Sequence, residues 1–223
     1  MFSNSGLFSA ARRSFLTRVG AGAAAFGAVA RPPVLAQASS GPFQPVRHAE
    51  DDWMDQLSGK HRLVFDATTP VGADTVRRFV DNYFFASKSG YSLDPSDLAV
   101  IVILRHHATP FAFNDAMWAK HGAAMSEELK FTDPAMSQAP THNVYNTSGL
   151  TFDNLAGRGV HFAVCGMAAR YFAGVAARKS GGNIDDIYRE LVANLLRNSH
   201  VVPAGIIAVN RTQERGYTFA FIG

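Results

Sequence analysis

The chain has 223 residues, with 21 Lys and Arg against 18 Asp and Glu and a formal net charge of +3 at pH 7. Apolar residues make up 47% and charged residues 17% of the chain, which is ordinary for a globular protein and excludes a disordered or fibrous one. The single cysteine excludes an intrachain disulfide.

The first 38 residues carry the pattern of a secretory leader. Arg12 and Arg13 precede a mild apolar run over residues 19–30, and the small-residue signal Ala36-Gln37-Ala38 follows. The run is short and rich in Gly and Ala, whereas a membrane-spanning helix needs about 20 strongly apolar residues. We therefore predict a twin-arginine (Tat) signal peptide over residues 1–38, exported by the Tat translocase to the periplasm and cleaved after Ala38, rather than a membrane anchor.

The leader also accounts for the basic character of the whole chain. Four of the 21 Lys and Arg lie in residues 1–38, which contain no acidic residue. The remainder has 17 basic and 18 acidic residues, and therefore a formal net charge of −1. Because no basic stripe remains, a nucleic acid is not expected as a partner. No stretch after residue 40 resembles a membrane span, so none is expected once the leader is removed.

Residues 39–59 are polar and are predicted to form a linker and a short lead-in, followed by one α/β domain over residues 60–223. A short apolar run at 61–66 predicts a buried strand, and apolar residues at helical spacing over 72–86 predict an amphipathic helix. Residues 98–104 are apolar on both faces, which is typical of a central parallel strand.

The second half of the domain continues this alternation. Pro110 is predicted to open a helix that reaches about Lys120, and residues 121–156 read as a long insertion, partly helical near residues 125–130. Asn183 is expected to cap a later helix. The remaining elements are predicted as a strand at 160–164, helices at 166–177 and 204–215, and strands at 200–202 and 217–221. The alternation predicts a three-layer α/β/α sandwich with an open, mainly parallel five-stranded sheet.

Cys165 stands where the third predicted strand ends and a helix begins. Ligands of open α/β sheets bind outside the carboxyl ends of the strands, and a helix N-terminus stabilises a thiolate. This position therefore suits a reactive thiol. The same position also suits a buried cysteine that packs as a small apolar side chain, as most free cysteines do. Position alone leaves both interpretations open.

Polar residues follow the first two strands at the same predicted edge. Arg105, His106 and His107 follow the second strand, and a cation there would stabilise a thiolate or hold an anion. Adjacent histidines point to opposite sides of an extended chain, so one of the two at most is expected to face a pocket. The candidate ligand-binding residues are Arg105, His106, His107, Asp66 and Gly166.

The sequence offers no motif for a metal or a cofactor, and neither is expected. The histidines show no HExxH or His-x-His spacing, and there is no CxxC, GxGxxG, P-loop or GxSxG. One route to a metal or redox site remains, in which His106, His107, His121 and His142 converge through the insertion.

Three segments together resemble the DsrE/DsrF-like (YchN-like) sulfur-relay family over roughly residues 60–223. They are GVHFAVCG at 159–166, VVPAG at 201–205 and GYTF at 216–219. The resemblance implies a parallel α/β/α sheet and an oligomer, often a trimer or hexamer. In the sulfur-carrying members of this family a cysteine after the third strand carries sulfur as a persulfide, and Cys165 matches that position.

Two hypotheses follow. In the first, the chain is an exported thiol protein, similar to a sulfur carrier or sulfurtransferase, that takes sulfane sulfur from a donor on Cys165 and passes it to an acceptor protein. In the second, it is a non-catalytic oligomeric domain that binds a small ligand or a partner protein at the ends of the strands.

Overall fold

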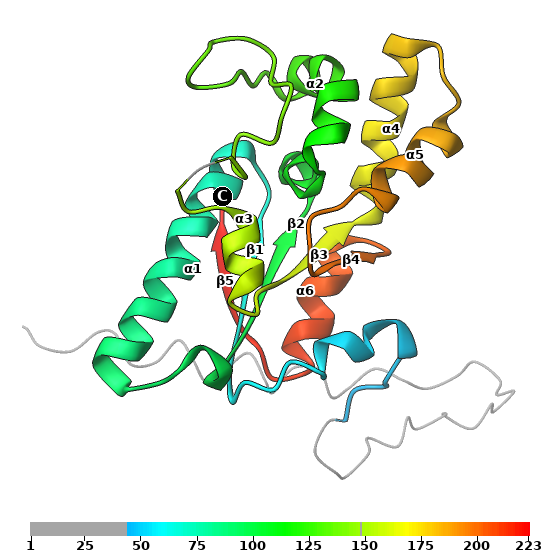
Figure 1. Ribbon diagram of the computed structural model, residues 1–223. Helices are drawn as coiled ribbons and strands as arrows, with labels where there is room; N and C mark the ends of the chain where they lie inside the picture. The colour runs from blue at the N-terminus through cyan, green and yellow to red at the C-terminus, as the bar shows by residue number, and fades with distance from the viewer. Residues whose placement is uncertain (1–43, 148) are drawn as a thin grey trace, which may run out of the picture. The chain divides into compact units, whose positions relative to one another are not determined.

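Five parallel strands form one open sheet in the computed structural model, which describes residues 44–147 and 149–223. They lie in the order β4-β3-β2-β1-β5 (Figure 1). The strands are β1 (His61–Ala67), β2 (Leu98–Leu104), β3 (His161–Cys165), β4 (Ser199–Val202) and β5 (Thr218–Ile222). The predicted signal peptide over residues 1–38 lies outside the described residues.

The handedness of the connections explains the layers. The chain steps from β1 to β2, β3 and β4 in one direction across the sheet, so right-handed crossovers place the intervening helices on one face. The connection from β4 to β5 returns in the opposite direction, so its helix lies on the other face. The result is the predicted three-layer α/β/α sandwich, with an entirely parallel sheet.

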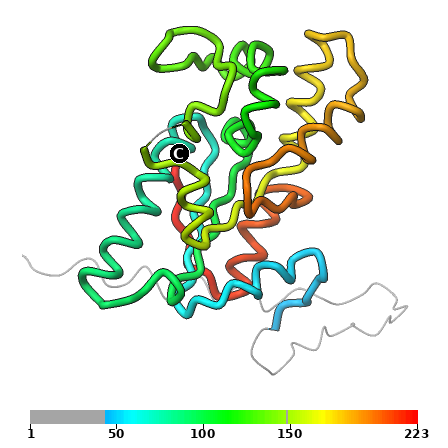
Figure 2. Tube along the Cα trace, viewed as in Figure 1, coloured from blue at the N-terminus to red at the C-terminus, as the bar shows by residue number. Residues whose placement is uncertain are grey.

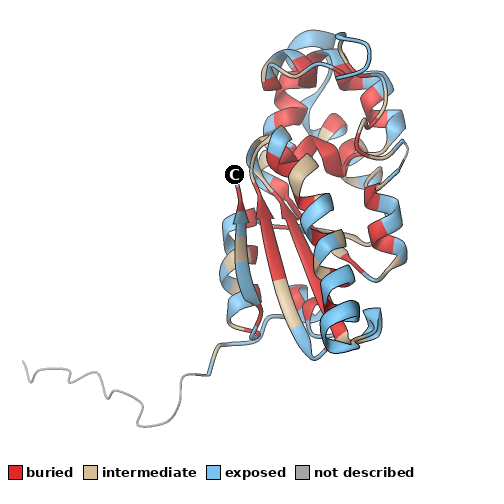
Figure 3. Ribbon diagram, turned by 90° about the vertical axis from the view of Figure 1, so that its left-hand side faces the viewer, coloured by how far each residue is buried: buried red, intermediate tan, exposed pale blue. Residues whose placement is uncertain are grey.

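Among the described residues, the first face carries five α-helices that enclose the larger core. Every residue of β2 is buried, as expected of the central strand, whereas the edge strand β5 is largely exposed (Figure 3). The helices of this face are α1 (Pro70–Tyr91), α2 (Asp115–Leu129), α3 (Phe152–Gly157), α4 (Gly166–Ser180) and α5 (Ile184–Ala193). The predicted cap of α5 is confirmed, because the Asn183 side chain accepts the N–H groups of Asp185 and Asp186.

The second face is covered by α6 (Gly205–Gln213) and by the lead-in, which contains the short 3₁₀ helix η1 (Ala49–Met54). Figure 2 shows this blue segment beside the end of α6. Met54 is fully buried in a core cluster with Ala208 of α6, and the Tyr217 hydroxyl donates a hydrogen bond of 2.8 Å to the Met54 carbonyl. This part of the predicted linker is therefore a packed layer of the domain.

The region after β2 differs from the sequence prediction. Pro110 does not open a long helix; it lies inside the 3₁₀ helix η3 (His106–Ala112), and α2 begins at Asp115 with Asn114 as its cap. The predicted insertion at 121–156 contains the second half of α2 and most of α3. The helix near residues 125–130 was predicted and belongs to α2, whereas α3 was not predicted.

The loop between α2 and α3 supports η3. The fully buried Asn143 donates from its side-chain amide to the carbonyls of Phe111 and Phe113, at 2.8 and 2.9 Å, and Tyr145 packs against the Phe111 ring. The insertion therefore holds in place the segment that carries His106 and His107.

Within the described residues, no helix is both long and apolar enough to cross a membrane.

Candidate functional site

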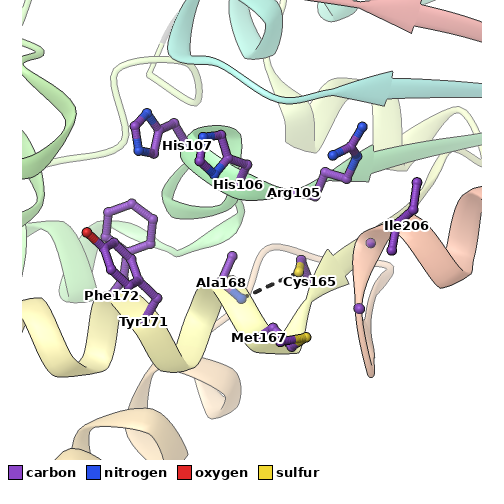
Figure 4. A pocket seen from close by; sticks show the side chains of 11 residues that line it. Arg105, His106, His107, Cys165, Met167, Ala168, Tyr171, Phe172 and Ile206 are labelled. Carbon is purple, nitrogen blue, oxygen red and sulfur yellow. Dashed lines mark hydrogen bonds between the residues drawn. The ribbon is translucent and has the colours of Figure 1, made fainter.

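A cavity of about 490 Å³ opens at the carboxyl edge of the sheet, beside the ends of β2, β3 and β4 (Figure 4). The chain leaves β3 toward α4 on one face and leaves β4 toward α6 on the other, so the cavity lies at a topological switch point, where open α/β sheets bind ligands. The residues that line it are Arg105, His106, His107, Cys165, Met167, Ala168, Tyr171, Phe172, Ala204, Gly205 and Ile206.

Cys165 lies at the start of α4 with its sulfur directed to the cavity (Figure 4). It is the N-cap residue of this helix, and its Sγ accepts the N–H of Ala168 at 3.4 Å. The residue is 7% exposed, so the cavity is the route by which a reagent reaches it. The sulfur therefore contacts the N-terminal turn of α4, where free N–H groups and the helix dipole create a positive potential.

Arg105 faces the cavity in a fixed orientation. Its Nε and one terminal nitrogen donate to the two carboxylate oxygens of Asp66, both at 2.8 Å, in a bidentate pair. This hydrogen bonding raises the pKa of Arg105 above its ordinary value; partial burial acts in the opposite direction, and the charge of Asp66 raises it further. A Cβ on Gly205 would overlap with the Cβ and Cδ of Arg105, so the glycine allows α6 to begin directly against this side chain.

His106 and His107 both line the cavity, which corrects the expectation that one at most would face it. The segment is a 3₁₀ turn rather than an extended chain, and His106 takes a left-handed backbone conformation with φ 53°. The two rings stack with centroids 4.1 Å apart. Partial burial lowers the pKa of His106, and the neighbouring His107 and Arg105 lower it further.

Two of the predicted residues lie behind the cavity wall. The Asp66 side chain is 2% exposed and contributes by holding Arg105. Gly166 is the first residue of α4 and packs against β4, where a Cβ would lie 3.0 Å from the Val202 carbonyl oxygen. The residues of α4 and α6 that complete the lining were not predicted from the sequence. The apolar Met167 and Tyr171, four residues apart just after Cys165, were an available signal for them.

The proposed convergence of four histidines is not found. His121 is buried between helices, with its Nε2 3.5 Å from a Glu190 carboxylate oxygen, and His142 Nε2 lies 3.6 Å from an Asp133 oxygen. Neither lines the cavity that contains His106 and His107. Among the described residues, no group of three or more His, Cys, Asp or Glu side chains is arranged to hold a metal ion.

Comparison with known proteins adds little. No family model matches the chain, and no curated protein matches it. One solved structure, a protein of unknown function from Methanobacterium thermoautotrophicum, aligns at 16% identity over 73% of this chain and 99% of its own, with a TM-score of 0.37. We draw no functional argument from a likeness at this level.

Proposed function

We propose that this chain is an exported thiol protein that takes up sulfane sulfur on Cys165 as a persulfide and passes it to an acceptor thiol. The observation that carries the proposal is the position of Cys165 in the cavity, where its sulfur accepts a helix N-terminal amide and where Arg105 and His106 also line the wall. The resemblance of residues 159–166, 201–205 and 216–219 to the DsrE/DsrF-like family supports the same chemistry.

The reaction requires no group beyond the donor and the acceptor. The Cys165 thiolate attacks the outer sulfur of a donor D–S–SH and forms a new S–S bond. The bond between the two donor sulfurs breaks, and D–S⁻ leaves with the electron pair while the outer sulfur keeps its proton. An acceptor thiolate then attacks the outer sulfur of Cys165–S–SH, and the Cys165 thiolate is released. The Ala168 amide and Arg105 stabilise the negative charge on Cys165 before the first step and after the second.

The intact mass of the purified protein tests this proposal. After incubation with a sulfane sulfur donor the mass is expected to rise by one sulfur atom and to return to its starting value on reduction. The Cys165→Ser variant should fold, because a serine hydroxyl is a good N-cap, and should acquire no sulfur. If native Cys165 neither gains sulfur nor reacts with an alkylating reagent, the thiol is a core residue and the relay function is wrong.

The export part of the proposal rests on the leader pattern in residues 1–38. Replacing Arg12 and Arg13 by Lys should block export to the periplasm, and N-terminal sequencing of exported protein should begin at Ser39. Unimpaired export of the Lys variant would contradict the Tat assignment.

The second candidate function is a non-catalytic oligomeric binding domain. It is favoured by the burial of Cys165 and by the number of apolar side chains around the cavity. A binding domain would retain its ligand in the Cys165→Ser variant, whereas a sulfur carrier would lose its function. Light scattering tests the predicted trimer or hexamer, which both functions share; a monomer at micromolar concentration would contradict it.

A further inference from the structure

The cavity around Cys165 has no permanently charged cation that is free to pair with an anion. Of the residues that line it, Arg105 is the one with a permanent positive charge, and the Asp66 carboxylate already neutralises that charge at 2.8 Å. Partial burial lowers the pKa of His106, which disfavours a second cation at this position. Inorganic sulfane donors such as thiosulfate are small, strongly hydrated anions. Transfer of such an anion into a site without an unpaired cation is unfavourable.

The wall of the cavity is apolar and aromatic. The stacked rings of His106 and His107 continue into Phe172, which lies edge-on to His107 with ring centroids 6.4 Å apart, and Tyr171 lies edge-on to Phe172 at 5.5 Å. Four aromatic rings from η3 and α4 therefore form one side of the cavity (Figure 4). Such a wall favours contact with an apolar or aromatic group of a ligand.

Exposed apolar side chains from two helices meet at the same cavity. Met167 and Tyr171 of α4 are 70% and 48% exposed, and Ile206 of α6 is 61% exposed. Single exposed apolar residues are common, but their convergence on one concave site is typical of a binding site. The volume of about 490 Å³ also exceeds what a few sulfur atoms need and suits an organic molecule.

From these observations we infer that the sulfur donor is an organic hydropersulfide, R–S–SH, whose R group is apolar or aromatic. This inference rests on the proposed function and names its substrate class. R lies against the rings and Ile206, and the outer sulfur reaches Cys165 at the polar end of the cavity. Cys165–S⁻ forms the S–S bond to the outer sulfur, the S–S bond of the donor breaks, and R–S⁻ leaves with the electron pair. Atoms and charge balance, and no oxidant or reductant is required.

The test compares the rates at which Cys165 gains sulfur from benzyl hydropersulfide, generated in situ, and from thiosulfate and inorganic tetrasulfide. Each rate is measured by intact mass on the full chain and divided by the rate of the same donor with N-acetylcysteine, which removes differences in intrinsic reactivity. The expected normalised rate is at least about tenfold higher for the benzyl donor, the discrimination that a hydrophobic pocket provides.

Variants assign this preference to the cavity. Met167→Ser combined with Ile206→Ser should lower the benzyl rate about tenfold and leave the inorganic rates unchanged. The matched control is Phe85→Ser, which removes an apolar side chain that is 73% exposed on α1 and does not line the cavity; it should change neither rate.

The outcomes separate the two levels of the proposal. Equal normalised rates for benzyl and inorganic donors would overturn the substrate class and leave the sulfur-carrier function standing. A benzyl preference that survives the double substitution would also overturn the substrate class as assigned to this cavity. Failure of Cys165 to gain sulfur from any of these donors would overturn both.

Discussion

Two stacked histidine pairs lie at opposite ends of the sheet, and their surroundings differ. At the carboxyl edge, the rings of His106 and His107 stack against each other and face the cavity of Cys165. Toward the amino edge, His161 Nδ1 lies 2.9 Å from His200 Nε2, and the Trp53 ring covers His200 with centroids 3.9 Å apart. The first pair is open to a ligand in the cavity. In the second pair the two histidines contact each other through their ring nitrogens, and the Trp53 ring covers them.

The difference shows that residue type does not decide what a histidine pair does. The covered pair joins the lead-in to β3 and β4, because Trp53 stacks on both rings. Burial lowers the pKa of both histidines, and the pKa of His200 falls to about 4. We therefore expect substitutions at the amino edge to affect stability and those at the carboxyl edge to affect sulfur transfer. Four predictions test this division, from the largest expected effect to the smallest.

Substitution of the Arg105–Asp66 pair should affect both stability and sulfur transfer, although the pair lies at the carboxyl edge. Arg105→Gln leaves the buried Asp66 carboxylate without its partner, so the free energy of unfolding should fall by about 3 kcal/mol. Sulfur uptake by Cys165 should slow as well, because the cation at the cavity is lost. Denaturant unfolding and the mass assay measure the two effects. The double variant Arg105→Gln/Asp66→Asn should recover most of the stability but not the rate; recovery of both would mean that Arg105 only holds the fold.

Trp53→Ala should destabilise the protein and leave sulfur uptake at its normal rate. The substitution removes the ring that covers His200 and packs the lead-in on the second face, so a loss of about 2 kcal/mol is expected. Chemical denaturation gives the stability, with Phe85→Ala as the control for loss of an exposed aromatic ring. A large fall in the uptake rate would show that the two edges are coupled.

Acidification should destabilise the protein through His200. Its folded pKa is lowered from 6.5 to about 4, so between these values the unfolded chain binds more protons than the folded one. Stability is therefore retained above pH 6.5, falls as the pH drops toward 4, and levels off below that value. The melting temperature should drop by a few degrees from this residue over that range. The His200→Gln variant should show a shallower pH dependence, and an unchanged slope would contradict the assignment.

His106→Gly should have the smallest effect on stability. The residue has φ 53°, a conformation that glycine adopts without steric cost, so stability should change by less than about 1 kcal/mol. Sulfur uptake from an aromatic donor should nevertheless slow, because the cavity loses one ring of its wall. Thermal unfolding and the donor comparison measure the two quantities. A clear loss of stability without a change in the uptake rate would show that the His106–His107 pair, like the His161–His200 pair, has a structural role.

Local patterns in the sequence were sufficient for most of the fold. The seven apolar residues of β2 occupy a buried central strand, and the alternation of strands and helices follows the predicted order. The position of Cys165 between β3 and α4 also follows from the local sequence, because the apolar run of the strand ends at this residue and the helical pattern begins after it. Each of these features depends on residues that are neighbours in the chain, where periodicity and capping preferences act directly.

The contacts that make the candidate site depend on the order of the strands. Asp66 pairs with Arg105 across 39 residues, and Gly205 and Ile206 reach the cavity because α6 crosses back over the sheet from β4. The covered histidine pair likewise joins residues 39 apart. The local sequence specifies that these side chains lie at strand ends, whereas only the packed sheet decides which of them meet. The cause is that contacts between distant segments depend on which strands become neighbours and which face each crossover takes, and neither is encoded in a single element.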